Sequence, residues 1–390
     1  MSLPGPRPGI AAFCTEAAHR ALAEELPARV SAFSLDQHDP GLVVDGLRAS
    51  GLFRYLVPES SGGAASPSGQ PGSVDVRTLC MVRECLGYLS PMADSIFAVQ
   101  GLGSYALVRT PAFPGRDRIL AEVVSGQRIC GFGLTEPEAG SDVASMRCEA
   151  RREGDGWLLE GEKIFISNVG IARHFIVFAS ADRSLGKKGI SAFLVDAASS
   201  GLVLEPIPMS VAHPFGRLLL QGCRAELIGE VGQGMRLALG TLDVFRTSVG
   251  AAACGMARRA FDEALEHVRT RKQFGVPLAE LQLTQAALAD MLTELEASRL
   301  LVYRAAATKD SGEAAGEAAG LHVAMAKMYA TEAAQRIIDR AVQLFGGRGV
   351  VTGNVAEQLY REIRPLRIYE GTTEVQKLII GGALARGARP

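Results

Sequence analysis

The chain has 390 residues, of which 47% are hydrophobic and 21% are charged, and its formal net charge is −1. This length supports two or three domains with large cores, and the composition is that of a folded globular protein. The balanced charge excludes the basic footprint of a protein that binds nucleic acid or an anionic membrane. No apolar run approaches the roughly 18 residues that a membrane-spanning helix needs.

The cysteines and histidines indicate a reduced protein without a metal site. The seven cysteines are odd in number and scattered, and none forms a C-x-x-C pair. The six histidines do not fall at metal-binding spacing beside them. The N-terminus also lacks a basic stretch followed by a long apolar one. Together these features favour a cytoplasmic protein.

Residues 1–127 have a helical pattern, which predicts an N-terminal helical domain. Ala11–Phe33 is rich in Ala, Glu and Leu, and Asp39-Pro40 opens a second helix that ends near Gly51. The segment Glu59–Gly72 is dense in Ser, Gly and Pro and predicts a mobile loop.

From about residue 128, apolar runs of strand length replace the helical pattern. Trp157–Asn168 predicts a hairpin with a short polar turn. His174–Ala179, Ile190–Val195 and Leu202–Ile207 predict further strands. Residues 128–228 are therefore expected to form a β-barrel-like or β-sandwich domain. Because no strand is followed by a Gly-rich turn and a helix, the sequence excludes a Rossmann fold.

Residues 229–390 return to a helical pattern. Met235–Arg271, Leu278–Lys309 and Leu321–Leu344 are long, rich in Ala and Leu, and joined by short links such as Asp310–Gly320. This pattern predicts a C-terminal four-helix bundle. The predicted fold class is α+β, with helical, β and helical domains in that order.

A stretch near the C-terminus, RIYEGTTEVQ, offers a candidate catalytic carboxylate. Thr373 and Gln376 have the spacing of a capping box, so the last helix should begin at Thr372 or Thr373. Gly371 permits backbone dihedrals that other residues avoid. Glu370 is then fixed on a turn with few neighbouring charges along the chain. Such a surrounding favours the neutral carboxyl and suits a general base near neutral pH, although an ordinary surface Glu is the alternative.

Three other stretches suit a cofactor, and a purely structural role remains open for each. Thr135–Asp142 is a polar loop whose N–H groups and hydroxyls can hold a ring edge or a phosphate, or is a plain turn. Phe165 and Ser167 share one side of a strand, which suits a flat heterocycle or a core. Arg269–Lys272 lies in the last turn of a helix, where cations offset the dipole without any ligand.

In this order and combination, these stretches resemble the acyl-CoA dehydrogenase family over nearly the whole chain. The motifs that carry the resemblance are Leu134-Thr135-Glu136-Pro137 with Gly140-Ser141-Asp142, Arg271-Lys272-Gln273-Phe274-Gly275, Gln343-Leu344-Phe345-Gly346-Gly347 and Ile368-Tyr369-Glu370-Gly371-Thr372. The resemblance implies FAD-dependent α,β-dehydrogenation of an acyl-CoA thioester. It also implies an electron-transfer flavoprotein as acceptor and a homo-oligomer, commonly a tetramer.

The resemblance assigns roles residue by residue. Glu370 matches the catalytic base, which removes the α-proton while flavin N5 takes the β-hydride. Some relatives carry the base one residue before the Arg of an Asp-x-x-Arg motif, where this chain has Phe245. The positions that match substrate contacts are Ser141, Asp243, Arg246 and Gly371. The positions that match FAD contacts are Leu134, Thr135, Phe165, Ile166, Ser167, Arg271, Gln273, Phe274, Gln282, Gln343, Phe345, Gly346, Gly347, Thr372 and Glu374.

Within that set, Ser167 is expected near flavin N5. The members that match residues holding the FAD pyrophosphate and adenosine of a neighbouring subunit are Arg271, Gln273, Gln282 and Gln343–Gly347. Thr372 and Glu374 match contacts to the adenosine half.

The sequence departs from the family pattern in two places. Phe165 and Ser167 stand where many relatives have Trp and Thr, and both keep a ring and a hydroxyl beside the flavin. Within Met209–Ile228, relatives usually carry an Arg-x-Ser element, whereas this chain has His213-Pro214-Phe215 and a shortened Gly222–Glu226. That region borders the thioester end of the family's site, so acyl specificity stays open, and His213 is either a substrate contact or structural.

Three other functions are compatible with the same fold. The first is a dehydrogenase of a carrier-protein thioester, which a basic docking surface would support. The second is a flavin oxidase or monooxygenase, a group that has usually lost the carboxylate of Glu370. The third is a non-catalytic flavoprotein that binds nucleic acid, which the near-neutral charge disfavours.

Overall fold

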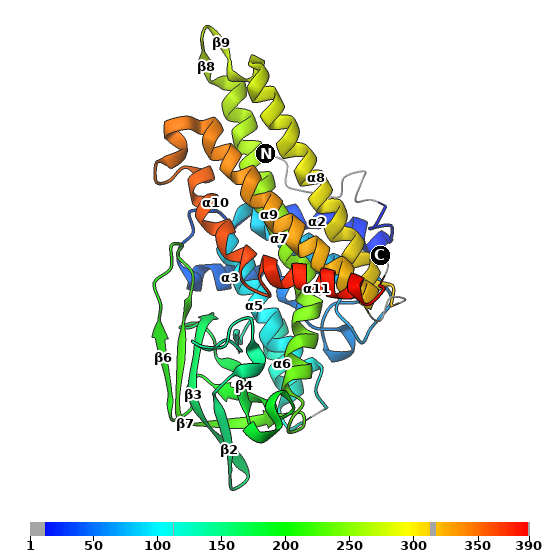
Figure 1. Cartoon of the computed structure of the whole chain (residues 1–390), viewed down its shortest axis with the longest axis vertical. Coiled ribbons are helices and arrows are strands. Elements are labelled where there is room, and N and C mark those ends of the chain that lie inside the picture. The colour runs from blue at the N-terminus through cyan, green and yellow to red at the C-terminus, as the bar shows by residue number, and fades with distance from the viewer. Residues whose placement is uncertain (1–11, 112, 313–316, 389–390) are drawn as a thin grey trace. The chain divides into compact units, whose positions relative to one another are not determined.

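The structure, a computed structural model, describes residues 12–111, 113–312 and 317–388 (Figure 1). The chain divides into two compact units. The helical unit consists of Met1–Gln37, Asp75–Asp94 and Arg246–Pro390, and the β unit of His38–Val74 and Ser95–Phe245. Among the described residues, no helix has the length and apolar character needed to cross a bilayer.

Most of the helical unit comes from long helices that the Ala- and Leu-rich pattern predicts. They are α7 (Gly234–Thr270, which begins in the β unit), α8 (Gln282–Asp310) and α9 (Glu317–Phe345). The shorter helices of this unit are α10 (Val355–Ile363), α11 (Thr373–Ala385), α2 (Ala17–Val30) and α4 (Val76–Leu89). The start expected at Ala11, and residues 313–316 of the expected loop Asp310–Gly320, lie outside the described residues.

The C-terminal helices pack as a bundle with small residues at the contact. Gly250 of α7 meets α8 and α9, since a Cβ there would lie 2.7 Å from Val302 and 3.4 Å from Ala330. Helix α8 lies along α9, and α11 packs on α9 (Figure 1). Only a residue without a side chain allows these backbones to approach so closely, which fits the predicted helical bundle.

The helices of the β unit also follow the sequence pattern. Helix α3 (Pro40–Ser50) begins after Asp39, whose carboxylate accepts from the backbone of Gly41, and ends at Gly51 with φ 66°. This confirms the predicted second helix. Between Glu59 and Gly72, the only helical segment is a 3-10 turn at Glu59–Ser61. Helices α5 (Pro91–Val108, which begins in the helical unit) and α6 (Arg116–Val124) complete the helices before the sheet.

The sheet closes on itself, as the predicted barrel-like domain requires. Its strands run in the order β1-β4-β2-β3-β7-β5, with β5 also pairing β4 and with β6 pairing β7. The strands are β1 (Cys130–Gly133), β2 (Glu149–Glu153), β3 (Gly156–Ser167), β4 (His174–Ser180), β5 (Ile190–Asp196), β6 (Leu202–Pro206) and β7 (Phe215–Ile228). Buried apolar side chains such as Phe175, Phe193 and Leu218 fill its core.

The predicted hairpin over Trp157–Asn168 is wrong. That segment lies in one continuous strand, β3, and the hairpin turn stands earlier, between β2 and β3 at Gly154 with φ 58°. The polar residues that suggested a turn surround Gly161, which has φ 136°. A Cβ at this position would lie only 3.0 Å from the backbone of Cys148. A bulge bends the strand there without reversing it, because β7 pairs with both halves.

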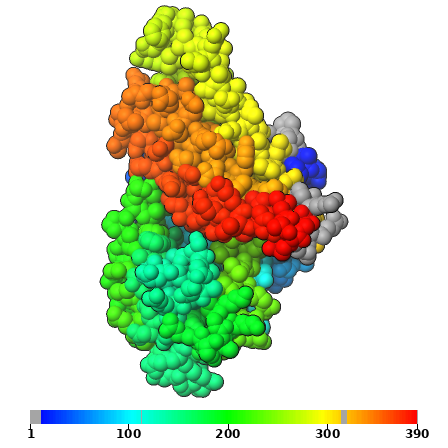
Figure 2. Space-filling view, in the orientation of Figure 1, coloured from blue at the N-terminus to red at the C-terminus, as the bar shows by residue number. Residues whose placement is uncertain are grey.

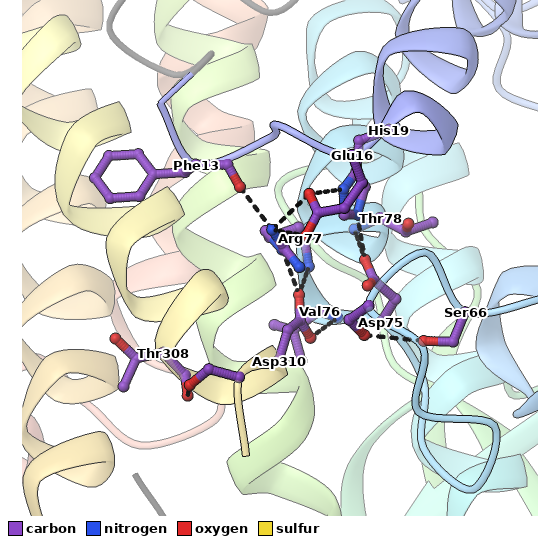
Figure 3. A network of polar contacts seen from close by, with 12 residues as sticks. Phe13, Glu16, His19, Ser66, Asp75, Val76, Arg77, Thr78, Thr308 and Asp310 are labelled. Carbon is purple, nitrogen blue, oxygen red and sulfur yellow. Dashed lines mark hydrogen bonds and ion pairs between the residues drawn. The ribbon is translucent and has the colours of Figure 1, made fainter. Parts of the chain in front are cut away.

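A buried network of charged residues joins helices α2, α4 and α8 in the helical unit (Figure 3). His19 is fully buried, and its ring nitrogens lie 2.9 Å from Glu16 and 2.8 Å from Asp75. Arg77 donates to Asp310 at 2.8 Å. Both His19 nitrogens can donate to carboxylates only if the ring is protonated, so the network holds an imidazolium.

This network predicts a pH-dependent stability. Burial alone would lower the pKa of His19, but the hydrogen bonds and charges of Asp75 and Glu16 outweigh it and raise the pKa above 6.5. A raised folded-state pKa stabilises the fold below pH 6.5, and this stabilisation is lost as pH rises through the folded pKa. We expect His19→Gln to lose about 1–3 kcal/mol at low pH and to flatten this dependence.

Thermal unfolding between about pH 6 and pH 9, the range around the pKa of a histidine, measures the effect. His38→Gln, at an exposed histidine, is the matched control. Equal pH slopes for the parent protein and His19→Gln would contradict the imidazolium assignment.

Candidate active site

Glu370 lies on a turn that precedes the last helix. Its φ is 53°, which is uncommon for a residue with a side chain, and Gly371 follows with φ 91°. Helix α11 begins at Thr373, as predicted, with Thr372 as its N-cap. The capping box between Thr373 and Gln376 is wrong. The Gln376 side chain donates instead to the carbonyl of Gly371 at 3.0 Å. The left-handed backbone at Glu370 and Gly371 turns that carbonyl toward Gln376.

Two cations from distant helices hold the carbonyl groups of this turn. Arg246 of α7 donates through Nε to the carbonyl of Glu370 at 2.9 Å. Lys327 of α9 donates through Nζ to the carbonyl of Gly371 at 2.8 Å. Hydrogen bonds from charged donors are stronger than neutral ones. The turn can therefore keep a left-handed residue at Glu370 that its own sequence does not favour.

The surroundings of Glu370 raise the proton affinity of its carboxylate. Burial raises its pKa, while the charges of Arg83, Arg246 and Lys327 oppose that rise. Its Oε2 is buried and accepts no hydrogen bond from any described residue. The expectation concerned charges along the chain, and the three cations come from helices distant in sequence. A raised pKa is what a general base needs near neutral pH.

One of these cations has a carboxylate partner of its own. Arg83 on α4 is fully buried and forms a bidentate pair with Asp94, with distances of 2.7 and 2.8 Å. Its third nitrogen donates to Ser248 at 3.0 Å. Sequence reasoning missed this pair, although a charged residue in the otherwise apolar segment of α4 was a usable signal.

The segments expected around the flavin ring lie together in the β unit. Leu134 and Thr135 directly follow β1, and the carbonyl of Thr135 accepts from the backbone of Ile164 at 2.9 Å. Phe165 follows with φ 61° and is 59% exposed. Its ring stacks on Phe215 at 6.0 Å between centroids. The His213-Pro214-Phe215 segment, where the sequence departs from the family pattern, therefore lies beside the predicted flavin segment.

These residues fit a flavin. Phe165 presents an exposed ring on a backbone twisted out of the strand, and Ser167 is a half-buried hydroxyl two residues later. An aromatic face and a hydroxyl donor are what a flat, polar-edged heterocycle requires. Ile166 is only 2% exposed and packs in the core, so it can contribute only through its backbone.

A buried ion pair supports the first flavin segment and escaped the sequence analysis. Lys163 on β3 is fully buried and lies 2.6 Å from the carboxylate of Glu136. The same ammonium lies 3.3 Å from the carbonyl of Leu134. Glu136 also accepts from the backbone of Arg147 and Cys148. The pair thus joins the Leu134–Glu136 segment to β3.

Most of the residues expected to hold adenosine and pyrophosphate lie where α7 and α9 end, whereas Thr372 and Glu374 lie at the start of α11, which contacts the middle of α9 at Glu332. Phe274 has φ 53° and is 91% exposed at the tip of the β8–β9 hairpin (Lys272–Gln273 and Val276–Pro277), which Figure 2 shows as a projection. Phe345 stacks on His267 with 4.5 Å between ring centroids. The other members are exposed, namely Arg271, Gln273, Gln282, Gln343, Gly346 and Gly347. Thr372 caps α11, and Glu374 is exposed in its first turn.

The predicted substrate residues occupy both units. Ser141 is exposed in the loop that follows β1, and Asp243 and Arg246 are one helical turn apart on α7. Between them, Phe245 is fully buried and packs directly on Gly101 of α5, where a Cβ would lie 2.3 Å from its ring. The position of the alternative base is therefore filled by an apolar ring.

Comparisons with known proteins agree with this arrangement. Two family models match the chain, "Acyl-CoA dehydrogenase, middle domain" over residues 131–223 and "Acyl-CoA dehydrogenase, C-terminal domain" over residues 232–385. The chain is 42% identical to the short-chain specific acyl-CoA dehydrogenase of Homo sapiens, over 90% of this chain and 84% of that protein. It is 35% identical to a 3-(aryl)acrylate reductase of Clostridium sporogenes, over 89% of this chain and 91% of that one.

A solved structure is similar over the full length. Butyryl-CoA dehydrogenase from Megasphaera elsdenii superposes with a TM-score of 0.83 and 31% identity, covering 99% of this chain and 100% of that one. With the matched motifs and the closed β unit, these findings place the chain in the acyl-CoA dehydrogenase family.

Proposed function

We propose that this protein is an FAD-dependent acyl-CoA dehydrogenase in which Glu370 removes the α-proton of the thioester. The observation that carries the proposal is the Glu370 turn, with its left-handed backbone, its buried carboxylate oxygen and its raised pKa. Bound FAD supplies the acceptor for the β-hydride. By family resemblance, the backbone N–H of Glu370 donates to the thioester carbonyl.

The β unit binds the flavin ring in this proposal. The Leu134-Thr135 segment and Ser167 supply hydrogen bonds, and Phe165 covers the ring. Ser141, Asp243, Arg246 and Gly371 contact the acyl thioester. Support comes from the backbone bond that joins Thr135 to β3 and from the exposed ring of Phe165.

The adenosine half of FAD is held across two subunits in this proposal. Phe274, Gln273 and Arg271 of one subunit, with the Gln343–Gly347 segment and Gln282, reach the cofactor of its neighbour. The 91% exposure of Phe274 supports this, because a large apolar side chain on a projecting hairpin is typical of a contact surface. The assembly is a homo-oligomer and, by family resemblance, a tetramer.

The same proposal covers the cellular setting. Electron-transfer flavoprotein re-oxidises the reduced enzyme, and the protein is cytoplasmic. Its seven cysteines are all free and buried, which supports a reducing compartment. The chain is further divided into domains at residues 1–127, 128–228 and 229–390, a division supported by the helix-to-strand change at β1 and the return to helix at α7.

The acyl group is short in this proposal, and CoA is its carrier. Support comes from the printed names of two relatives, a short-chain specific and a butyryl-CoA dehydrogenase. Anaerobic titration with acyl-CoAs of increasing length, followed by flavin absorbance, tests both points. We expect short acyl-CoAs to bleach the flavin at stoichiometric concentration. Bleaching only by a carrier-protein thioester would establish the alternative carrier, and bleaching by neither would exclude the dehydrogenase.

A further inference from the structure

Lys327 is a buried cation directed at the catalytic turn. It lies in the middle of α9, its residue is fully buried, and its ammonium donates to the carbonyl of Gly371 at 2.8 Å. Among the described residues, no carboxylate lies within ion-pair distance of it. A buried lysine without a bonded carboxylate is costly, so its charge is expected to be offset by nearby charge at longer range.

The carbonyl that Lys327 contacts has a second, uncharged donor. Gln376 of α11 is also fully buried, and its amide donates to the same oxygen at 3.0 Å. The two donors hold one atom of the turn from two helices. They differ in charge and not in the group they bind, so comparing them separates a structural from an electrostatic role.

The charged groups that act on Glu370 come from four different helices. They are Arg83 of α4, Asp94 of α5, Arg246 of α7 and Lys327 of α9. Lys327 is faced in turn by Glu370, Arg246, Glu332 and Glu374. Arg83 has the largest effect of the three cations on Glu370, and the carboxylate of Asp94, with which it forms a bidentate pair, offsets part of that effect. The charges of Arg246 and Lys327 add to that of Arg83 in favouring the ionised carboxylate.

We propose that Lys327 is a positioning residue that fixes the Glu370 turn through Gly371 and, by its charge, sets the proton affinity of the catalytic carboxylate. The inference rests on the proposed role of Glu370 as base. Burial alone favours the protonated carboxyl, which cannot accept the α-proton. A cation that bonds the next residue's carbonyl stabilises the carboxylate without donating to it, so the oxygen remains available to the substrate.

The pKa shifts of Lys327 and Glu370 agree with this geometry. Burial lowers the pKa of Lys327 to about 8, against the opposing charge of Glu370. The charge of Lys327 in turn acts against the burial that raises the pKa of Glu370. At neutral pH, Lys327 therefore keeps its proton and its effect on Glu370.

The test compares Lys327→Met with Gln376→Met in the FAD-loaded enzyme. Each variant removes one donor to Gly371, but only the first removes a charge. The rate of anaerobic flavin reduction by a saturating acyl-CoA is measured from about pH 5 to pH 9, the range in which a general base titrates. We expect the acid limb to move up by about one to two pH units in Lys327→Met and to stay in place in Gln376→Met.

Lys327→Gln replaces Lys327→Met if the latter does not fold, because it keeps an amide donor while removing the charge, and the same shift is expected. A readout independent of turnover is the carboxyl band of Glu370 in infrared pH titrations, assigned by its loss in Glu370→Gln. An equal response of the Lys327 and Gln376 variants, or an unmoved acid limb, would reduce Lys327 to a structural donor. If the parent enzyme itself shows no flavin reduction, the proposed function fails instead, while the infrared titration still decides the role of Lys327.

Discussion

Replacing Glu370 by Gln is expected to stop flavin reduction by acyl-CoA while leaving the flavin bound. The amide keeps the size of the side chain but cannot accept a proton, and loss of a positioned base costs about 10²- to 10⁴-fold in rate. The turn should survive, because Arg246 and Lys327 hold the carbonyls of Glu370 and Gly371 and do not bond its carboxylate. Anaerobic stopped-flow mixing with acyl-CoA measures the rate.

Two controls accompany this variant. Flavin content and the affinity for acyl-CoA should match those of the parent protein, which shows that the site is still formed. Glu294→Gln makes the same chemical change at a glutamate of the same unit that pairs with Arg336, and it should keep the parental rate. A Glu370→Gln variant that reduces its flavin at the parental rate would mean that another group is the base.

The second large effect is expected from Lys163→Met in the β unit. The substitution leaves Glu136 only 5% exposed without its cation, and breaking a buried pair in this way costs about 3–5 kcal/mol. The Leu134 segment also loses its link to β3, so the protein should retain less FAD. Urea unfolding followed by far-UV circular dichroism measures the stability, and flavin content after gel filtration measures the retention.

A matched variant separates charge from packing at this pair. Adding Glu136→Gln to Lys163→Met removes the uncompensated charge and should restore part of the lost stability. Lys187→Met, at an exposed lysine of the same unit, should change stability by less than about 0.5 kcal/mol. A Lys163→Met loss no larger than that of Lys187→Met would show that the pair does not support the fold.

The sequence predicted the elements well where one periodicity persists over many residues. The long helices α7, α8 and α9 begin and end within a few residues of their predicted bounds because Ala and Leu stripes repeat over several turns. Strand β3 was mistaken for a hairpin because Gly161 and its charged neighbours have the composition of a turn. The partner strand β7 decides that question, and its pairing is not visible locally.

In the candidate site too, local features could be predicted and contacts between distant segments could not. Local motifs and the family resemblance that they carry together singled out Glu370 and the segments at Thr135 and Phe165, because each is a local feature of the chain. Lys327 and Arg83 could not be found in this way, since they reach the Glu370 turn from helices distant in sequence. Contacts of that kind depend on how the helices pack, which a single sequence does not encode in any local pattern.

The most direct test of the proposed chemistry is one anaerobic turnover with butyryl-CoA deuterated at the α-carbon, followed by mass spectrometry of the recovered ester. If Glu370 removes an α-proton while FAD takes the β-hydride, the flavin bleaches and the ester loses one α-deuterium and one β-hydrogen. The Glu370→Gln variant should return the ester unchanged. Bleaching in the parent enzyme with both α-deuterons retained would contradict α,β-dehydrogenation by this protein.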